Sequence, residues 1–251
     1  MSIFIKENPL DNDSLLKEIK GLKLIQENLN KLENTIIRTP KIITYDKSFI
    51  KMEKVNQSFS SNNQQKQLGI ILAKLHKIKQ NSFGFDEDNY IGLSKQKNIL
   101  SENWGEFFYN YRLLFQINLI KEKPIKEEFL ESLINIKPYL IKFLNATTKH
   151  PSLVHGDLWS GNVLFSKDEI FLIDPAVYYG DREVDIAMSE MFGGFNKEFY
   201  SAYNQEYPLS YEYEKKKNIY NLYHFLNHYN LFGKSYLANS ISLLNSIKTL
   251  F

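Results

Sequence analysis

The middle of the chain combines side-chain types and spacings that could bind a metal ion and move a proton. Asp157 and Asn162 lie close together on a glycine-containing stretch, and Asp174 ends a short apolar run. The apolar runs 163–165 and 170–173 flank a polar turn, so they predict an antiparallel hairpin. This hairpin would place Asn162 beside Asp174. An amide oxygen next to a carboxylate suits Mg²⁺.

These side chains have a chemical use in phosphoryl transfer. In that reaction metal ions neutralise the polyphosphate, while a separate aspartate accepts or orients the proton of the attacking hydroxyl. The spacing from Asp157 to Asn162 matches that of the kinase catalytic loop, which makes Asp157 the candidate base. Two other interpretations remain open. One is a hydrolytic metal site made from His155, Asp157 and Asp174, and the other is a set of ordinary turn residues.

Phosphoryl transfer also requires a lysine for the phosphates and a carboxylate that holds this lysine. Lys6 ends an apolar run that predicts a strand over 2–6, and Glu18 flanks the apolar stripe of a predicted helix. We therefore predict that Lys6 pairs with Glu18. By their order along the chain, Met52 and Glu53 begin the stretch whose backbone would bind the adenine base.

Composition and charge exclude several classes of protein. The 251 residues carry a formal net charge of +2 with scattered lysines, which argues against nucleic acid as a partner. Cysteine is absent, which excludes disulfides, thiolate catalysis and cysteine-bound zinc. His224 and His228 have metal-ligand spacing on one helix face, but without an evident third ligand we expect them to pack. No signal peptide or membrane-spanning run is found, so we expect a cytoplasmic protein.

The elements that must position these side chains follow from the apolar periodicity. A helix is predicted near 14–29, and a hairpin over 42–45 and 49–52. The polar run 56–67 is predicted to be a loop that joins two lobes. Beyond it we predict mainly helices, at 68–76, at 101–120, at 126–145 where Pro138 could kink or split the helix, and from 183 to 251.

Motifs throughout the chain resemble one known family. Residues 155–162 read HGDLWSGN, and residues 174–188 read DPAVYYGDREVDIAM. Further matches follow in order, among them Phe83 to Phe85, Asp88 to Gly92, Trp104, Arg112, Met191 to Phe195, and Tyr220 to His228. With these motifs the chain is similar to the fructosamine-3-kinase and ketosamine-3-kinase family.

The resemblance implies an α+β, protein-kinase-like fold of two lobes. A nucleotide-binding N-terminal lobe would cover residues 1–56, and a larger helical C-terminal lobe would cover residues 57–251. The implied activity uses ATP and Mg²⁺ to phosphorylate the sugar 3-hydroxyl of a ketosamine, either free or on a glycated protein. The implied biological role is deglycation repair.

The family's catalytic and nucleotide roles carry over to matching positions of this chain. Asp157 would be the catalytic base, and Asn162 and Asp174 would hold Mg²⁺. Lys6 would bind the phosphates of the nucleotide, and Glu18 would hold Lys6 in place.

Other matching positions are candidates for contact with the substrate. Trp159 would form a wall for the sugar, and Asn89 and Gln96 lie on a motif loop of the family. Tyr178 could line a substrate groove or pack in the core. Asp185 is expected to brace the catalytic loop by hydrogen bonds.

One part of the family's pattern is not found in this sequence. Members begin with two strands and a glycine-containing phosphate loop, whereas this sequence starts at the lysine strand and contains no G-x-G-x-x-G. Either the true start of the protein lies upstream of Met1, or the N-terminal lobe is truncated and lacks these strands and this loop. Two alternative functions stay open. They are a related phosphotransferase for aminoglycosides or choline, and a nucleotide-binding pseudokinase without catalysis.

Overall fold

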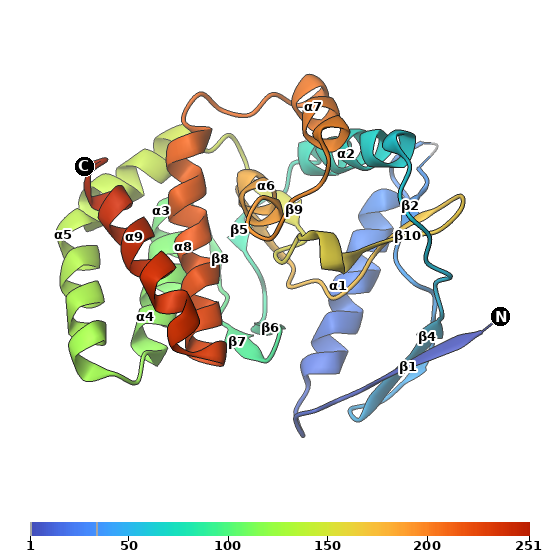
Figure 1. The fold of residues 1–251 in the computed structure, drawn as a ribbon, viewed down its shortest axis with the longest axis horizontal. Helices are drawn as coiled ribbons and strands as arrows, with labels where there is room; N and C mark the ends of the chain where they lie inside the picture. Colours follow the sequence, from blue (N-terminus) through green and yellow to red (C-terminus); the bar gives the residue numbers. More distant parts are fainter. Residues whose placement is uncertain (1, 34) are drawn as a thin grey trace.

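The computed structural model describes residues 2–33 and 35–251, and its first elements form a small sheet with a long helix beside it (Figure 1). These elements are β1 (Ile3–Glu7), α1 (Ser14–Leu29), β2 (Ile37–Arg38), β3 (Ile42–Tyr45) and β4 (Phe49–Glu53). The sheet has the antiparallel order β1-β4-β3. The predicted first strand, helix and hairpin are confirmed.

Helix α1 takes part in two hydrophobic cores, which fixes its orientation. Leu15 and Ile19 pack against β4 under the small sheet. Further along the same apolar stripe, Ile25 and Leu29 reach the main core of the protein. Burying one such side chain stabilises the fold by about 1.5–3 kcal/mol. A rotation of α1, which would move Glu18, is therefore opposed at both ends of the helix.

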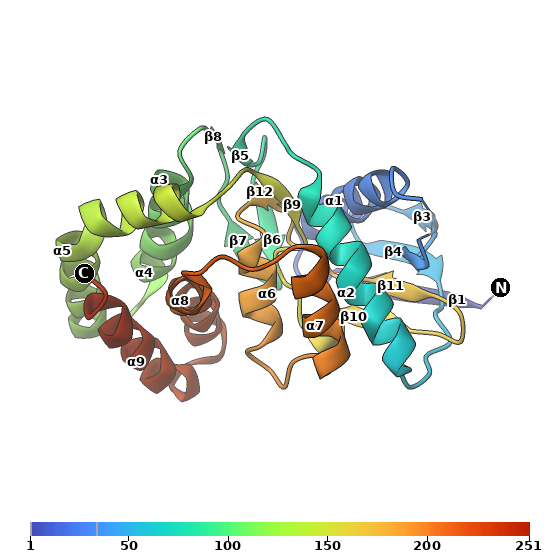
Figure 2. The same cartoon turned by 90° about the horizontal axis from the view of Figure 1, so that it is seen from above.

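Most of the chain after residue 61 is helical (Figure 2). The helical segments are α2 (Asn62–Lys77), α3 (Trp104–Phe108), a π-helical segment (Tyr109–Leu114), α4 (Phe115–Leu119), α5 (Lys123–Thr147), α6 (Glu183–Ser189), α7 (Lys197–Glu206), α8 (Tyr213–Phe232), α9 (Leu237–Lys248), and 3-10 turns at Ser160–Asn162 and Lys234–Tyr236. Helices α5, α8 and α9 gather at the end of the molecule away from β1. Within residues 2–33 and 35–251, no helix combines the length and apolar character needed to cross a membrane.

Two predicted helices differ in detail from the structure. The helix expected over 101–120 is interrupted by the π-helical segment, which inserts a wider turn between α3 and α4. The helix expected over 126–145 is α5, and it continues through Pro138 as one element.

The polar run at 56–67 was predicted to be a loop, and its second part is instead helical. Helix α2 begins at Asn62, directly after its N-cap Ser61. The hydroxyl of Ser61 accepts a hydrogen bond from the Gln64 backbone N–H, and Oε1 of Gln64 accepts one from the Ser61 N–H. This capping box satisfies two backbone donors at the helix start, which a judgement from polar composition overlooks.

Short strands lie between the small N-terminal sheet and helices α5, α8 and α9, and they carry most of the candidate site. They are β5 (Phe83–Gly84), β6 (Asn89–Ile91), β7 (Ser94–Gln96), β8 (Leu100–Ser101), β9 (Ser152–Val154), β10 (Val163–Phe165), β11 (Ile170–Leu172) and β12 (Tyr178–Gly180). The predicted hairpin is confirmed, because β10 pairs antiparallel with β11. Strand β2 pairs in parallel with β11, so a strand from before residue 56 joins a sheet beyond it. The division into lobes at residue 56 stays a prediction.

Candidate active site

The residues predicted to act on the nucleotide, the metal and the proton meet around one cavity. Lys6, Glu18, Asp157, Asn162 and Asp174 all line it, and its volume is about 260 Å³. Lys6 and Asp174 are 168 positions apart in the sequence and are in direct contact. The fold therefore assembles the predicted constellation in a space that is open to a ligand.

The β10–β11 hairpin places Asn162 and Asp174 at the same end. The Ile173 N–H donates to the Asn162 carbonyl oxygen at 3.1 Å, just beyond the paired strands. The side-chain amide of Asn162 donates to Oδ2 of Asp157 at 3.1 Å and to its backbone carbonyl at 2.8 Å. Because the amide nitrogen is turned toward Asp157, the amide oxygen of Asn162 is left to bind a cation.

The available donors fit Mg²⁺ bound together with a polyphosphate. In the described parts of the chain, no group of three or more His, Cys, Asp or Glu side chains could hold a metal ion. Mg²⁺ commonly takes one or two protein ligands and completes its shell with water and phosphate oxygens. Asn162 and Asp174 supply such a pair, and the Asp174 side chain is 47% exposed.

Lys6 connects the Asp174 carboxylate to helix α1. Its ammonium lies 2.7 Å from Oε2 of Glu18 and 2.9 Å from Oδ1 of Asp174, which confirms the predicted pair with Glu18. Burial disfavours the ammonium, but the two carboxylates outweigh burial and raise the pKa of Lys6. Burial also raises the pKa of Glu18 to about 7, against the lowering effect of Lys6. We take Lys6 as the charged member of the cluster, because two carboxylates face it.

Asp157 has the properties of a general base for neutral pH. Burial raises the pKa of its carboxyl to about 7, with a further rise from Asp174 and Asp185 and a lowering by the hydrogen bond from Asn162. A catalytic base works best when its pKa lies near the working pH. The shift comes mainly from the loss of water around the carboxylate, so it depends on the depth of the cavity.

Asp185 braces the loop that carries Asp157, as the sequence analysis predicts. It is fully buried in the first turn of α6 and accepts hydrogen bonds from the N–H groups of His155 at 2.7 Å and Gly156 at 2.9 Å. Gly156 has a φ of +80°, and a Cβ there would lie 2.1 Å from the Ala176 carbonyl oxygen. A side chain at this position would clash with the Ala176 carbonyl, two residues after Asp174.

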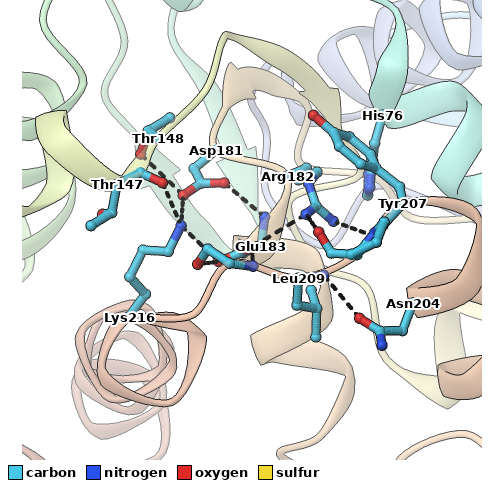
Figure 3. Close-up of polar contacts among 12 residues, drawn as sticks. His76, Thr147, Thr148, Asp181, Arg182, Glu183, Asn204, Tyr207, Leu209 and Lys216 are labelled. Carbon is cyan, nitrogen blue, oxygen red and sulfur yellow. Dashed lines mark hydrogen bonds and ion pairs between the residues drawn. The ribbon is translucent and has the colours of Figure 1, made fainter.

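A buried ionic cluster anchors the start of α6 and therefore Asp185 (Figure 3). Lys216 of α8 is 1% exposed, and its ammonium lies 2.7 Å from Oδ2 of Asp181 and 2.6 Å from Oε2 of Glu183. Tyr220 donates a further hydrogen bond to Oδ2 of Asp181 at 2.7 Å. Removing one member of such a buried cluster typically costs about 3–5 kcal/mol, because its partner keeps an uncompensated charge.

A second cavity, of about 340 Å³, opens beside Asp157. Asp157, Trp159 and Gly92 line both cavities and separate them. The other walls of the second cavity are mainly aromatic and apolar, and they are formed by Ile91, Met188, Phe192, Asn227, His228, Leu231, Phe232 and Tyr236. The ring centres of Trp159 and Phe192 are 6.3 Å apart. A molecule in this cavity would have the carboxylate of Asp157 at its inner edge.

Of these aromatic walls, only Trp159 was predicted from the sequence to contact the substrate. His228 packs its ring 5.5 Å from Phe232 and 5.0 Å from Tyr236, centre to centre, and so meets the expectation of packing while also lining the cavity. The spacing of these three residues by four positions was the local signal that could have revealed an aromatic surface. Phe192 comes from a separate segment, so no local pattern links it to them.

Of the other candidates for substrate contact, only Asn89 lines one of the two cavities. Tyr178 is 1% exposed, and the Arg112 guanidinium lies 4.1 Å from its ring centre. Gln96 is also 1% exposed, so neither side chain offers surface to a substrate, and we reassign both to support of the site. Asn89 lines the smaller cavity, but its amide nitrogen donates to the Val177 carbonyl at 2.7 Å.

The predicted adenine-binding stretch lies at the end of β4. Met52 is 5% exposed and belongs to the small core under the sheet. The carboxylate of Glu53 pairs with Arg38, and the backbone N–H of Glu53 donates to the Lys41 carbonyl at 3.0 Å. Neither residue lines the cavity that contains Lys6. An adenine contact with the backbone of the stretch that begins at Met52 and Glu53 stays a prediction.

A larger cavity, of about 780 Å³, lies against another face of α1. Lys20 and Lys23 of α1 line it together with Tyr45 and Tyr179. None of the predicted catalytic or metal-binding residues reaches it, so we assign the chemistry to the smaller cavity.

The chain is similar to known proteins over most of its length. A family model described as fructosamine kinase matches residues 2–249. A "Probable ketoamine kinase" of Vibrio parahaemolyticus is 46% identical over 177 residues, which are 70% of this chain and 60% of the relative. A chloroplastic protein-ribulosamine 3-kinase of Oryza sativa subsp. indica is 35% identical over 252 residues, 97% of this chain and 72% of the relative. The chain spans 60–62% of the length of three Vibrio relatives that it matches.

Two solved structures are also similar to this chain. A Haemophilus somnus protein described as a candidate fructosamine-3-kinase superposes with a TM-score of 0.84 at 30% identity, covering 98% of this chain and 82% of the other. An ADP-bound aminoglycoside phosphotransferase superposes with a TM-score of 0.60 at 19% identity, covering 99% and 88%, which shows a common fold. The chain therefore has an α+β, protein-kinase-like fold, as predicted. It belongs to the fructosamine kinase family.

Proposed function

We propose that the protein is a kinase that transfers a phosphoryl group from ATP to the sugar 3-hydroxyl of a ketosamine, as a step in the repair of glycated amines or proteins. The observation that carries this proposal is the position of Asp157 between two cavities. One cavity contains Lys6 and Asp174, and the other has aromatic walls. The names of the relatives, ketoamine kinase and ribulosamine 3-kinase, support the choice of acceptor.

The residues of the smaller cavity divide the work of phosphoryl transfer. Asn162 and Asp174 would hold Mg²⁺, which when bound offsets the charge of the phosphates. Lys6, held by Glu18, orients the phosphates. The acceptor oxygen forms a bond to the terminal phosphorus while the bond from phosphorus to the ADP oxygen breaks. Asp157 takes the hydroxyl proton and, with a pKa near 7, can release it to water afterwards.

The second cavity suits a sugar that is joined to an amine. Aromatic rings provide flat apolar surfaces for the carbon-bound face of a sugar, and they attract a cation placed over them. The amine of a ketosamine is protonated at neutral pH. Burial lowers the pKa of His228, so this ring is uncharged at neutral pH and does not repel an ammonium group. The cavity therefore favours a cationic, sugar-bearing acceptor.

The proposed function is tested by ADP release from Mg²⁺-ATP with fructosyl-lysine, ribulosyl-lysine, kanamycin and choline as separate acceptors. We expect turnover with the two ketosamines and a phosphate on the 3-oxygen of the product, observed by phosphorus NMR. Turnover with kanamycin or choline alone would instead support a related phosphotransferase. ATP binding without transfer to any acceptor would support a nucleotide-binding protein without catalysis.

Replacing Trp159 with alanine tests the acceptor cavity. Trp159 is 37% exposed, and its ring lies against Gly161, where a Cβ would come within 2.2 Å of the ring. Loss of a ring contact worth about 1–1.5 kcal/mol predicts a rise of about tenfold in KM for the ketosamine. KM for ATP should rise less than KM for the ketosamine, because Trp159 lines the nucleotide cavity only at the boundary that the two cavities share. Tyr211→Ala, at an aromatic residue that is 99% exposed, is the control. An equal rise in KM for ATP would contradict the separation of the two cavities.

A further inference from the structure

The backbone at Asp174 requires support from its surroundings. Asp174 has a φ of +53°, and it is the only non-glycine residue with a positive φ within 2–33 and 35–251. This left-handed conformation is unfavourable for a residue with a side chain, and it persists where surrounding contacts impose it. The contacts on both sides of Asp174 therefore decide where its carboxylate points.

The segment before Asp174 is held by the catalytic loop. The Ile173 N–H donates to the Asn162 carbonyl at 3.1 Å, and the Ile173 carbonyl lies 3.0 Å from Nε2 of His155. These contacts connect the metal-binding residues to each other. They do not constrain the peptides that follow Asp174.

The segment after Asp174 is held by the β6–β7 hairpin. The Ala176 carbonyl accepts a hydrogen bond from Nε2 of Gln96 at 3.0 Å, and the Val177 carbonyl accepts one from Nδ2 of Asn89 at 2.7 Å. The Ala176 N–H donates to the His155 carbonyl at 2.9 Å. Through its N–H and its carbonyl, Ala176 thus joins the catalytic loop to the hairpin, two residues after Asp174.

The hairpin amides are themselves fixed in orientation. Nε2 of Gln96 also donates to Oδ1 of Asn89 at 2.9 Å, and Oε1 of Gln96 accepts from the Tyr223 hydroxyl at 2.7 Å. Asn98 donates to the same Oδ1 of Asn89 at 3.0 Å. Arg112, which is 0% exposed, donates to Oδ1 of Asn98 at 2.8 Å. With its amide fully used inside the protein, Gln96 has no group left to bind a substrate.

We propose that Gln96 and Asn89 are positioning residues that hold the 174–177 segment, and with it the carboxylate of Asp174, in the geometry that binds Mg²⁺. The inference rests on the proposed function in one respect, because it takes Asp174 as a metal ligand. In this proposal the β6–β7 hairpin, which carries Asn89 and Gln96, supports the metal ligand Asp174. The sequence had instead suggested that these two residues contact the substrate.

The test is Gln96→Met, which keeps the length of the side chain and removes its hydrogen-bonding groups. We expect the affinity for Mn²⁺, measured by electron paramagnetic resonance with a non-hydrolysable ATP analogue, to fall by about tenfold or more, as for other partners that orient metal ligands. Amide hydrogen exchange of a peptide covering 173–178 should become faster. The Mg²⁺ concentration for half-maximal turnover should rise, while KM for the acceptor stays unchanged.

Gln65→Met is the matched control, since Gln65 is also buried but donates to the Ser60 hydroxyl, away from the site. It should leave Mn²⁺ binding unchanged. Asn89→Ala removes the bond to the Val177 carbonyl and provides a second variant if Gln96→Met does not fold. It should also lower the affinity for Mn²⁺. Wild-type Mn²⁺ affinity in a folded Gln96 or Asn89 variant would overturn the inference, as would equal weakening in Gln65→Met.

These outcomes are distinguishable from failure of the proposed function. If wild-type protein binds Mn²⁺ with the nucleotide analogue but phosphorylates no acceptor, the function fails and the positioning role stands. If the wild-type protein binds no metal with the analogue, both are overturned.

Discussion

Replacing Asp157 with asparagine is expected to lower the rate of phosphoryl transfer by about a hundred- to ten-thousandfold, the usual contribution of a positioned general base. The amide keeps the size of the side chain, so binding of nucleotide should survive. The same change is expected to stabilise the folded protein at alkaline pH. Activity and stability should therefore move in opposite directions.

The stability effect follows from the pKa of Asp157, which burial raises to about 7 from an ordinary value of 3.8. A carboxyl whose pKa is higher in the folded state contributes stability that is complete below about pH 4 and is lost as the pH rises through about 7. One unit of pKa difference is worth about 1.4 kcal/mol, so the full difference amounts to about 4 kcal/mol. Water that enters the cavity reduces this difference in stability. We therefore expect Asp157→Asn to be more stable than the wild type by about 2 kcal/mol at pH 8.

Urea unfolding at pH 5 and pH 8 measures the effect. The free energy of unfolding of Asp157→Asn should exceed that of the wild type at pH 8, and this difference should be smaller at pH 5. Asp168→Asn, at an exposed carboxylate in the β10–β11 turn, is the control and should change neither activity nor stability. If Asp157→Asn kept most of its activity, Asp157 would not be the base.

Replacing Lys6 with methionine is expected to lower kcat/KM for ATP by about a hundredfold or more, in the range found when one charged or hydrogen-bonding group is removed from a transition state. The ammonium touches both Glu18 and Asp174, so its loss removes the proposed phosphate contact and leaves two carboxylates facing each other. Glu18 is 11% exposed, and without Lys6 its charge is no longer compensated. The variant should therefore also be less stable at neutral pH.

A second substitution separates these two effects. Lys6→Met combined with Glu18→Gln removes the uncompensated charge, so it should recover stability while activity stays low. Steady-state kinetics and thermal unfolding on the same samples measure both quantities. Lys47→Met, at an exposed lysine in the β3–β4 turn, is the control. Recovery of turnover in the double variant would show that Lys6 acts only as a structural partner of Glu18.

The sequence by itself determined the local geometry of the site. A hairpin turn sets Asn162 beside Asp174, and the Ser61 to Gln64 capping box sets the start of α2, although only the hairpin was recognised in advance. Lys6 and Glu18 are 12 positions apart, so one strand, one loop and one helix are enough to pair them. Such arrangements depend on strand alternation and helical period, which a single sequence shows directly.

Only the tertiary structure decided which residues from distant segments of the chain meet at the site. The aromatic cavity brings Trp159 together with Phe192 and His228, which come from separate segments. The amide of Gln96 donates to the Ala176 carbonyl, 80 positions away, and no local pattern predicts this contact. Contacts over such separations are fixed by how the elements pack, and packing depends on the shapes of many side chains at once rather than on any local period.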